Sequence, residues 1–170
     1  LMGQWAKARG IKLIGVAAGA DKCALAREAG YFAVLDRTND DIVTRVKEIT
    51  NGKGVYAVFD SVGKQTFGTT LDCLGPRGYF VSFGATTGAP PPVEAGMLQK
   101  RGSLYFTRPT LVTYSSDPAD YAASAGKVLD MVASGTLKPH IGQRYPLDQA
   151  AQAHRDLEAG KTTGATLLIP

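Results

Sequence analysis

Two apolar runs of the chain each end in small and polar residues, an arrangement typical of a ligand-binding edge. Val55–Phe59 is followed by Asp60-Ser-Val-Gly63, and Tyr79–Phe83 is followed by Gly84-Ala-Thr-Thr-Gly88. A helical stretch separates the two runs, so the segment predicts a strand, a loop, a helix and a second strand. Because ligands bind at the carboxyl ends of the strands in open parallel sheets, we expect a nucleotide or cofactor along this edge.

Ser61 and Gly84 are the residues of these two loops that could contact a flat ring. The Ser61 hydroxyl and the tight turn around it would lie beside a cofactor, although the same turn could cap the following helix. Gly84 permits close approach of the backbone to a ring, and we expect a nicotinamide there. A plain turn is the alternative for Gly84.

The end of an earlier strand indicates which dinucleotide the chain would prefer. Folds that bind NAD place Asp or Glu at this point to bind the adenosine ribose hydroxyls. Here the strand ends in Gly15-Val-Ala-Ala-Gly19, and the first acid, Asp21, is followed directly by Lys22. A missing acid beside a cation suits a 2′-phosphate, which favours NADP over NAD. Arg37 could reach the same phosphate, whereas Lys22 could also be a plain surface residue at a helix start.

The remaining candidate side chains give weaker evidence for a metal site, a catalytic group or a binding surface. His140 and His154 lie far apart in the sequence and lack carboxylate or cysteine partners at ligand spacing, so we expect no metal site. Neither histidine belongs to a nucleophile–base pattern, which leaves a hydrolase without support. Lys161 opens a Lys-Thr-Thr-Gly segment that could approach the cofactor or simply turn the chain into its last strand. Tyr105 and Phe106 suit a core or an interface better than a nucleic-acid platform.

The elements that would position these residues alternate along the chain. Asp40 and Asp41 are expected in the first turn of one helix, where they would complement its dipole. The alternation predicts an α/β fold, a Rossmann-like doubly wound parallel sheet. We expect this chain to lack the first strand and the glycine-rich loop of that fold, because it starts inside a predicted helix in which Gly3 is the only glycine. The expected strands are 11–16, 32–35, 55–59, 79–83, 102–108 and 165–169, and the better-defined helices are 2–9, 20–29, 93–100, 118–134 and 147–159.

Composition fits one globular domain of 170 residues, 44% of them hydrophobic and 20% charged. The net charge of +4 suits an anionic small ligand but is also ordinary for a solvated surface. No apolar run approaches the roughly 20 residues that a membrane span needs. Cys23 and Cys73 are far apart in the sequence and are expected to be reduced, buried thiols of a cytoplasmic protein.

Several motifs together resemble the NADPH-dependent quinone oxidoreductases, the zinc-free, zeta-crystallin-like branch of the medium-chain dehydrogenase/reductase superfamily. The resemblance covers essentially the whole chain, and the motifs are specific as a set although each alone is weak. They are Lys47-Glu-Ile-Thr-Asn-Gly-Lys-Gly54, Asp60-Ser-Val-Gly-Lys64, Leu71-Asp-Cys-Leu74, Val81-Ser-Phe-Gly84, Gly102-Ser-Leu-Tyr105, Thr107-Arg-Pro109 and Leu167-Leu-Ile-Pro170.

The resemblance implies hydride transfer from NADPH to a quinone by a subunit about twice this long. This chain would be a single, incomplete dinucleotide-binding domain, residues 1–170, without the GroES-like catalytic domain, and it would have little or no activity alone. By resemblance Lys22 and Arg37 bind the 2′-phosphate, although bacterial members commonly have tyrosine at the position of Arg37. Phe83 and Gly84 would face the nicotinamide, and the strand at 102–108 would pair across a homodimer.

Three other functions remain open at this stage. The chain could belong to an enoyl or alkenal reductase of the same superfamily, which a substrate screen would distinguish. It could be a methyltransferase on a similar sheet, which would bind S-adenosylmethionine instead of NADPH. It could also be a non-catalytic nucleotide- or RNA-binding module, which salt-dependent RNA retention would reveal.

Overall fold

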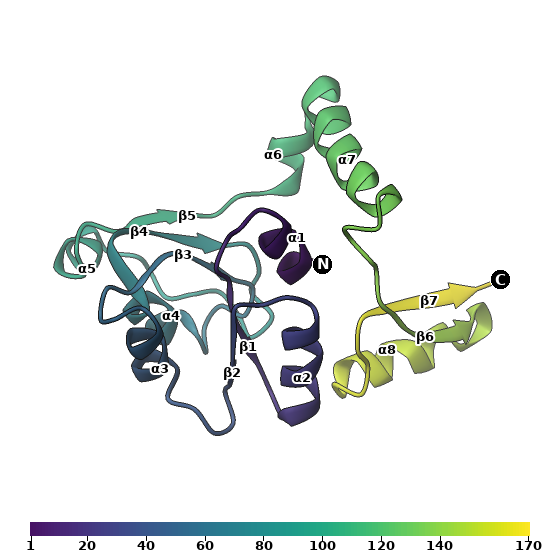
Figure 1. The fold of residues 1–170 in the computed structure, drawn as a ribbon, viewed down its shortest axis with the longest axis horizontal. Helices are drawn as coiled ribbons and strands as arrows, with labels where there is room; N and C mark the ends of the chain where they lie inside the picture. The colour runs from purple at the N-terminus through teal and green to yellow at the C-terminus, as the bar shows by residue number, and fades with distance from the viewer. The chain divides into compact units, whose positions relative to one another are not determined.

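A computed structural model describes residues 1–170, and the chain divides into two compact units. The first unit consists of Leu1–Val34 with Ala125–Pro170, and the second unit is Leu35–Ser124. Helices and strands alternate along the chain, as the sequence predicts (Figure 1). None of the helices is both long enough and apolar enough to cross a membrane.

The first unit brings together segments from the two ends of the chain. The Gln4 side chain, on a short N-terminal helix, bonds the backbone of Lys138 in both directions, at 3.3 Å and 2.9 Å. The Tyr145 hydroxyl donates to Asp156 at 2.9 Å and so joins a strand to the helix that follows it. The elements of this unit are α1 (Met2–Ala8), β1 (Ile14–Ala17), α2 (Ala20–Glu28), β6 (Ile141–Pro146), a 3₁₀ turn (Leu147–Gln149), α8 (Ala150–Glu158) and β7 (Ala165–Ile169).

Two further elements span the boundary between the units, namely β2 (Ala33–Asp36) and α7 (Pro118–Ala133). Strand β2 pairs with β1 in a two-stranded sheet, and β6 pairs in parallel with β7 in another. Strand β7 matches the expected range, whereas the sequence analysis assigned no strand to β6. The side chains of β6 alternate between half-buried and exposed, with Ile141, Gln143 and Tyr145 on the covered face.

The second unit is built on a three-stranded parallel sheet in the order β3-β4-β5. Phe80 lies at the centre of its core and packs with Phe67 and Leu71 of a helix and with Leu104 before the last strand. The elements of this unit are α3 (Ile42–Ile49), β3 (Val55–Asp60), α4 (Phe67–Asp72), β4 (Leu74–Ser82), α5 (Ala95–Lys100), β5 (Tyr105–Thr107) and α6 (Leu111–Ser115).

Several boundaries in this unit differ from expectation. Strand β5 covers only Tyr105–Thr107 of the expected strand 102–108, and α5 begins at Ala95 rather than at residue 93. Strand β4 starts earlier than predicted, and Arg77 within it has φ of +59°. Helix α6 was not predicted, and Thr110 caps it by accepting a bond from Thr113 N. Asp41 is the N-cap of α3 rather than a residue of its first turn, because its carboxylate accepts from Thr44 N at 2.8 Å. Asp40 lies before that helix and belongs to a turn described below.

Candidate functional site

Two loops at the carboxyl ends of β3 and β4 are bonded to each other along their length. We call residues 61–66 and 83–88 the loop pair. Thr87 donates to the carbonyl of Val62 twice, through its N–H at 2.9 Å and through its hydroxyl at 2.7 Å. Ser61 contributes its carbonyl, which accepts a backbone N–H from the other loop at 3.2 Å. The loop pair is therefore one hydrogen-bonded structure rather than two separate turns.

Asp60, the last residue of β3, organises the first of these loops. One carboxylate oxygen accepts the N–H groups of Val62 and Gly63, both at 2.8 Å. The other oxygen accepts the hydroxyls of Thr66 at 2.6 Å and Thr70 at 2.9 Å. The side chain belongs to a residue that is only 5% exposed, and four donors surround it. A buried carboxylate with this number of donors is satisfied as an anion.

Opposing effects act on the pKa of Asp60. Burial raises the pKa of the carboxyl, because a charge is less stable away from water. The hydrogen bonds from Thr66, Gly63, Thr70 and Val62 lower it, and together they outweigh the effect of burial. The pKa therefore lies below its ordinary value of 3.8, and Asp60 is ionised at neutral pH.

Glycine is required at two contacts within the loop pair. Gly63 has φ of +87°, and a Cβ at this position would lie 2.3 Å from the carbonyl oxygen of Gly88. A Cβ on Gly84 would lie 2.6 Å from the carbonyl oxygen of Ser61. Real Cβ atoms do not approach backbone oxygens so closely, because the repulsion is steep. The approach of the two loops therefore depends on the absence of side chains at both positions.

The predicted residues Ser61, Phe83 and Gly84 lie together at this edge of the second unit. Phe83 opens the second loop of the pair, and its N–H donates to the Asp60 carbonyl at 2.9 Å. The residue is 53% exposed, so its ring is available to a ligand. Arg108 donates to the Ser82 carbonyl at 2.8 Å and holds the end of β4 directly before Phe83. The geometry provides a rigid, mostly uncharged surface with one exposed ring.

Arg37 also lies in the second unit, in the turn that follows β2. Its side chain is exposed and takes part in none of the ion pairs of the chain. An exposed guanidinium without a protein partner can bind a phosphate in bidentate fashion. The structure thus leaves Arg37 available for the anion that the sequence analysis assigned to it.

The first unit brings Lys22 and the turn that contains Lys161 together. The Lys22 ammonium donates to the carbonyl of Gly160 at 3.1 Å, and Gly160 precedes Lys161 in the chain. Lys161 itself lies 3.6 Å from an oxygen of Asp156. Both ammonium groups are on exposed residues. Their juxtaposition, 138 residues apart in the sequence, could not be seen from local spacing.

The chain does not provide a set of side chains suited to a metal ion. No group of three or more His, Cys, Asp or Glu residues comes close enough together to bind one. Burial raises the pKa of Cys73 to about 11, and the nearby Asp72 adds to the shift. Zinc binds the thiolate form of cysteine, so this thiol is a poor ligand at neutral pH.

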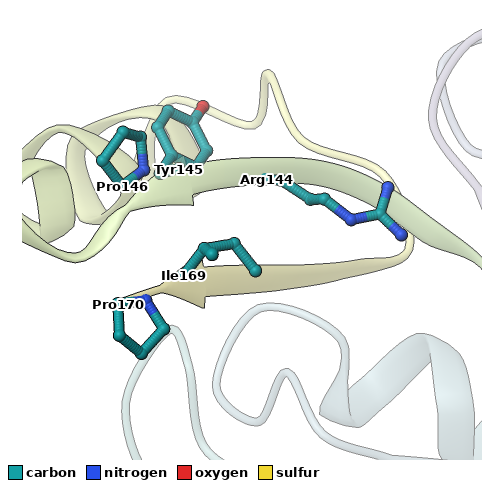
Figure 2. Close-up of a pocket in the computed structure, with 5 residues that line it drawn as sticks. All are labelled: Arg144, Tyr145, Pro146, Ile169 and Pro170. Carbon is teal, nitrogen blue, oxygen red and sulfur yellow. The ribbon is translucent and has the colours of Figure 1, made fainter.

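A pocket of about 280 Å³ lies in the first unit (Figure 2). Arg144, Tyr145 and Pro146 of β6 form one wall, and Ile169 and Pro170 at the end of the chain form the other. None of the candidate cofactor residues lines it. We therefore do not assign the cofactor to this pocket.

The part played by Asp60 was not predicted from the sequence, in which this residue was expected only as part of a turn. A signal was present, because Thr70 follows Thr66, the N-cap of α4, by four residues, so the two side chains lie on the same side of the helix start. The hydrogen bonds of Asp60 could have been predicted from three features together. These are an aspartate at a strand end, a glycine three residues later and this pair of threonines. The contribution of Thr87 had no comparable signal, since it depends on how the second loop meets the first.

Comparisons with known proteins find dehydrogenases and reductases as relatives of this chain. Residues 29–168 match the sequence profile of a family described as zinc-binding dehydrogenase. A quinone oxidoreductase of Pseudomonas aeruginosa is 44% identical over 167 residues, which are 98% of this chain and 51% of the relative. A 2-haloacrylate reductase of a Burkholderia species is 35% identical over 171 residues, covering 100% of this chain and 51% of the relative.

A solved structure supports the fold class. The crystal structure of Escherichia coli quinone oxidoreductase complexed with NADPH matches with a TM-score of 0.94 and 44% identity, covering 99% of this chain and 52% of that one. The expected Rossmann-like α/β fold is therefore confirmed. The chain spans about half the length of the curated relatives it matches.

Proposed function

We propose, because this chain belongs to the zinc-binding dehydrogenase family, that it is the cofactor-binding part of an oxidoreductase transferring hydride from NADPH to a quinone. The observation that supports this most is the similarity, over nearly the whole chain, to quinone oxidoreductases that include an NADPH complex. The loop pair adds a physical reason, because a rigid strand-end surface with an exposed ring suits a nicotinamide.

We assign each proposed residue to the part of the cofactor that its charge or shape suits. Lys22 and Arg37 supply cations for the 2′-phosphate, and Lys161 adds a third near Lys22. Phe83 and Gly84 present a flat surface to the nicotinamide, with Ser61 beside them. NADPH supplies the hydride when it is bound, and the protein's share is binding and orientation.

The zinc in the family description does not fit this chain, and we propose that it works without that metal. The described side chains form no cluster of ligands, and the Cys73 thiol is held protonated by its burial. We also propose a cytoplasmic location, since Cys73 is a buried thiol outside any disulfide.

We propose further that a GroES-like catalytic domain completes the protein. The support for this proposal is that the chain spans only about half the length of the quinone oxidoreductases it resembles. In the first unit β6 and β7 pair in parallel with each other, and Leu167, Leu168 and Ile169 of β7 are exposed.

The 2′-phosphate assignment predicts a selective effect of Lys22→Ala. We expect the Kd for NADPH to rise about tenfold, because a charge-assisted hydrogen bond is lost. The Kd for NADH should change little. Isothermal titration of both nucleotides provides the measurement, with Lys127→Ala as a control that removes an exposed lysine elsewhere. Equal NADPH and NADH affinities in wild type and in Lys22→Ala would remove the assignment.

The chain alone should have little or no quinone reductase activity. We expect the loop pair to supply no general acid, and we expect substrate contacts to come largely from the proposed second domain. The measurement is the loss of NADPH absorbance with 1,4-benzoquinone as acceptor. A robust rate from the purified 170-residue chain would contradict this expectation.

A homodimer through residues 102–108 is also proposed. Strand β5 pairs only with β4, so its outer edge is available to a second copy. We expect sedimentation analysis to show a dimer that Tyr105→Lys weakens, because the new charge would face its own copy. Tyr56→Lys, on the opposite edge strand β3, should leave the dimer intact. A monomeric wild-type protein would rule out this interface.

A second candidate is reduction of an activated carbon–carbon double bond. The similarity to a 2-haloacrylate reductase favours it, since that relative also covers the whole chain. Both candidates use the same cofactor part. The substrate screen that separates them requires the protein with its proposed catalytic domain.

A further inference from the structure

We propose that Asp40 is a positioning residue for Arg37. It holds the turn after β2 so that the Arg37 guanidinium stays available to the 2′-phosphate of NADPH. This inference rests on the proposed function, because the ligand is the same cofactor. It concerns a residue that does not itself touch the cofactor, and whose negative charge would by itself disfavour a phosphate.

The backbone of the turn is closed at both ends by residues that flank Arg37. The Asp36 carbonyl accepts the N–H groups of Asn39 at 3.0 Å and Asp40 at 2.8 Å. In the reverse direction, the Asp40 carboxylate accepts the Asp36 N–H at 2.7 Å. Asp40 therefore bonds Asp36 twice, once through its backbone and once through its side chain. Arg37 is enclosed between these bonds, so its backbone has little freedom.

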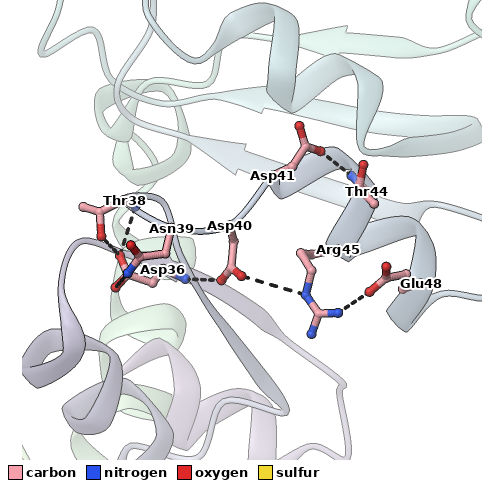
Figure 3. Close-up of polar contacts among 8 residues, drawn as sticks. All are labelled: Asp36, Thr38, Asn39, Asp40, Asp41, Thr44, Arg45 and Glu48. Atoms are coloured by element: carbon pink, nitrogen blue, oxygen red, sulfur yellow. Dashed lines mark hydrogen bonds and ion pairs between the residues drawn. The ribbon is translucent and has the colours of Figure 1, made fainter.

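The side chains of the turn are used inside it (Figure 3). One oxygen of the Asp36 carboxylate accepts the N–H of Thr38 at 3.0 Å and its hydroxyl at 2.6 Å. The other accepts the Asn39 amide at 3.2 Å. Every polar side chain from Asp36 to Asp40 thus has a partner in the turn except that of Arg37. The Arg37 guanidinium forms no ion pair with an acid of the chain.

Asp36 and Asp40 are the acids closest to Arg37 in the sequence, and each could form an ion pair with it if its carboxylate were not already bonded elsewhere. A guanidinium paired with an adjacent carboxylate must lose that partner before it can bind a phosphate. Here the second oxygen of Asp40 lies 4.0 Å from Nε of Arg45, and Arg45 is also paired with Glu48 of α3. The Asp40 carboxylate contacts the Asp36 N–H and Arg45 and forms no ion pair with Arg37. The same acid that closes the turn is thus kept from competing with the ligand.

Binding of small adenosine nucleotides to the whole 170-residue chain tests this role. The probes are adenosine 2′,5′-bisphosphate and 5′-AMP, which differ by the 2′-phosphate. We expect Asp40→Ala to weaken the bisphosphate about fivefold through the lost positioning of Arg37, with 5′-AMP unchanged. Asp40→Asn keeps an oxygen for the Asp36 N–H and should bind the bisphosphate at least as well as wild type. If charge alone mattered, both variants would bind it more tightly, because a repulsive acid is gone.

Asp41→Ala is the matched control. It removes an acid from the next position, but that acid caps α3 through Thr44 and does not touch the turn. We expect it to lower the stability of α3 without weakening the preference for the bisphosphate. An equal loss of preference in Asp41→Ala would mean that general damage, not positioning, explains the effect.

The outcomes separate this inference from the proposed function. If wild type does not prefer the bisphosphate over 5′-AMP, the NADPH assignment itself fails. If wild type prefers it and Arg37→Ala loses the preference while Asp40→Ala keeps it, only the positioning role is overturned. Should Asp40→Ala not fold by circular dichroism, Asp40→Glu decides, since it keeps the charge but displaces the oxygen that accepts the Asp36 N–H. We expect a two- to threefold loss there, and an unchanged preference would overturn the role.

Discussion

Replacing Asp60 with alanine is expected to destabilise the second unit by about 3 kcal/mol. The substitution removes an acceptor from two backbone N–H groups and two threonine hydroxyls at once. A buried donor without a partner destabilises the fold, because it has also lost its hydrogen bonds to water. Asp60→Asn keeps one carbonyl oxygen for the N–H groups of Val62 and Gly63, so its cost should be nearer 1 kcal/mol.

Urea unfolding followed by far-ultraviolet circular dichroism provides the measurement. Asp72→Ala is the matched control, because it removes an acid of the same unit that forms only a surface ion pair with Arg101. Surface pairs contribute about 0.2–1 kcal/mol, so the control should lie close to wild type. Fluorescence of Trp5, the one tryptophan of the chain, reports the first unit separately. Equal stabilities of Asp60→Ala and Asp72→Ala would refute the central place given to Asp60.

The Asp60 effect should depend on pH in one direction only. Because the pKa of this carboxyl is lower in the folded chain than its ordinary value of 3.8, the ionised form stabilises the fold. That contribution is complete above pH 3.8 and is lost as the pH falls through the folded pKa. The gap in stability between wild type and Asp60→Asn should therefore be constant near neutrality and shrink only in acid below 3.8.

Gly63→Ala is expected to be comparably damaging, at about 2–4 kcal/mol. Alanine is strained at a φ of +87°, and its Cβ would meet the carbonyl of Gly88 at 2.3 Å. That oxygen belongs to the backbone of the second loop, so the contact is relieved only by separating the loop pair. Thermal unfolding of the variant measures the loss.

Gly68→Ala is the matched control for this experiment. Gly68 lies in α4, five residues after Gly63, and a Cβ there would meet nothing within 4 Å. Alanine is the better helix former by about 1 kcal/mol, so this variant should be as stable as wild type or slightly more so. If Gly63→Ala unfolds at the same temperature as Gly68→Ala, the loop pair can separate freely and the proposed rigid surface is wrong.

Sequence patterns predicted elements well where a local signal and the tertiary structure agree. Strand β7 has its expected bounds, because an apolar run ends at Pro170. Helix α7 starts where expected, since Asp117 accepts the N–H of Ala119 at 2.8 Å. Strand β6 was missed although its alternating side chains carry the period of a strand. Its Gly142 and the closing Pro146 resemble a turn, and only the pairing with β7 makes it a strand.

In the candidate site, too, some features could be predicted from local sequence and others depend on contacts between distant residues. The residue types at three positions were informative. Lys22 and Arg37, near a strand end that lacks an acid, suggested a phosphate, and Gly84 suggested close approach of a ring. Their surroundings were not predictable, since the bonds of Lys22 and Thr87 join residues 138 and 25 positions apart. Strand β4 illustrates a third case, in which the sequence predicted a strand only from Tyr79, where the apolar run begins. The structure instead continues the strand back to Leu74, with an irregular register beside β3.

The bonds within the loop pair also constrain how this part of the protein can be varied by evolution or by engineering. A longer segment or a bulkier residue in either loop must be matched by a change in the other, since they share Val62, Thr87 and the contact of Gly63 with Gly88. Libraries that diversify residues 61–66 alone would mostly sample unfolded chains. Those that diversify 61–66 and 83–88 together, around a retained Asp60, would search the shapes that this surface can adopt.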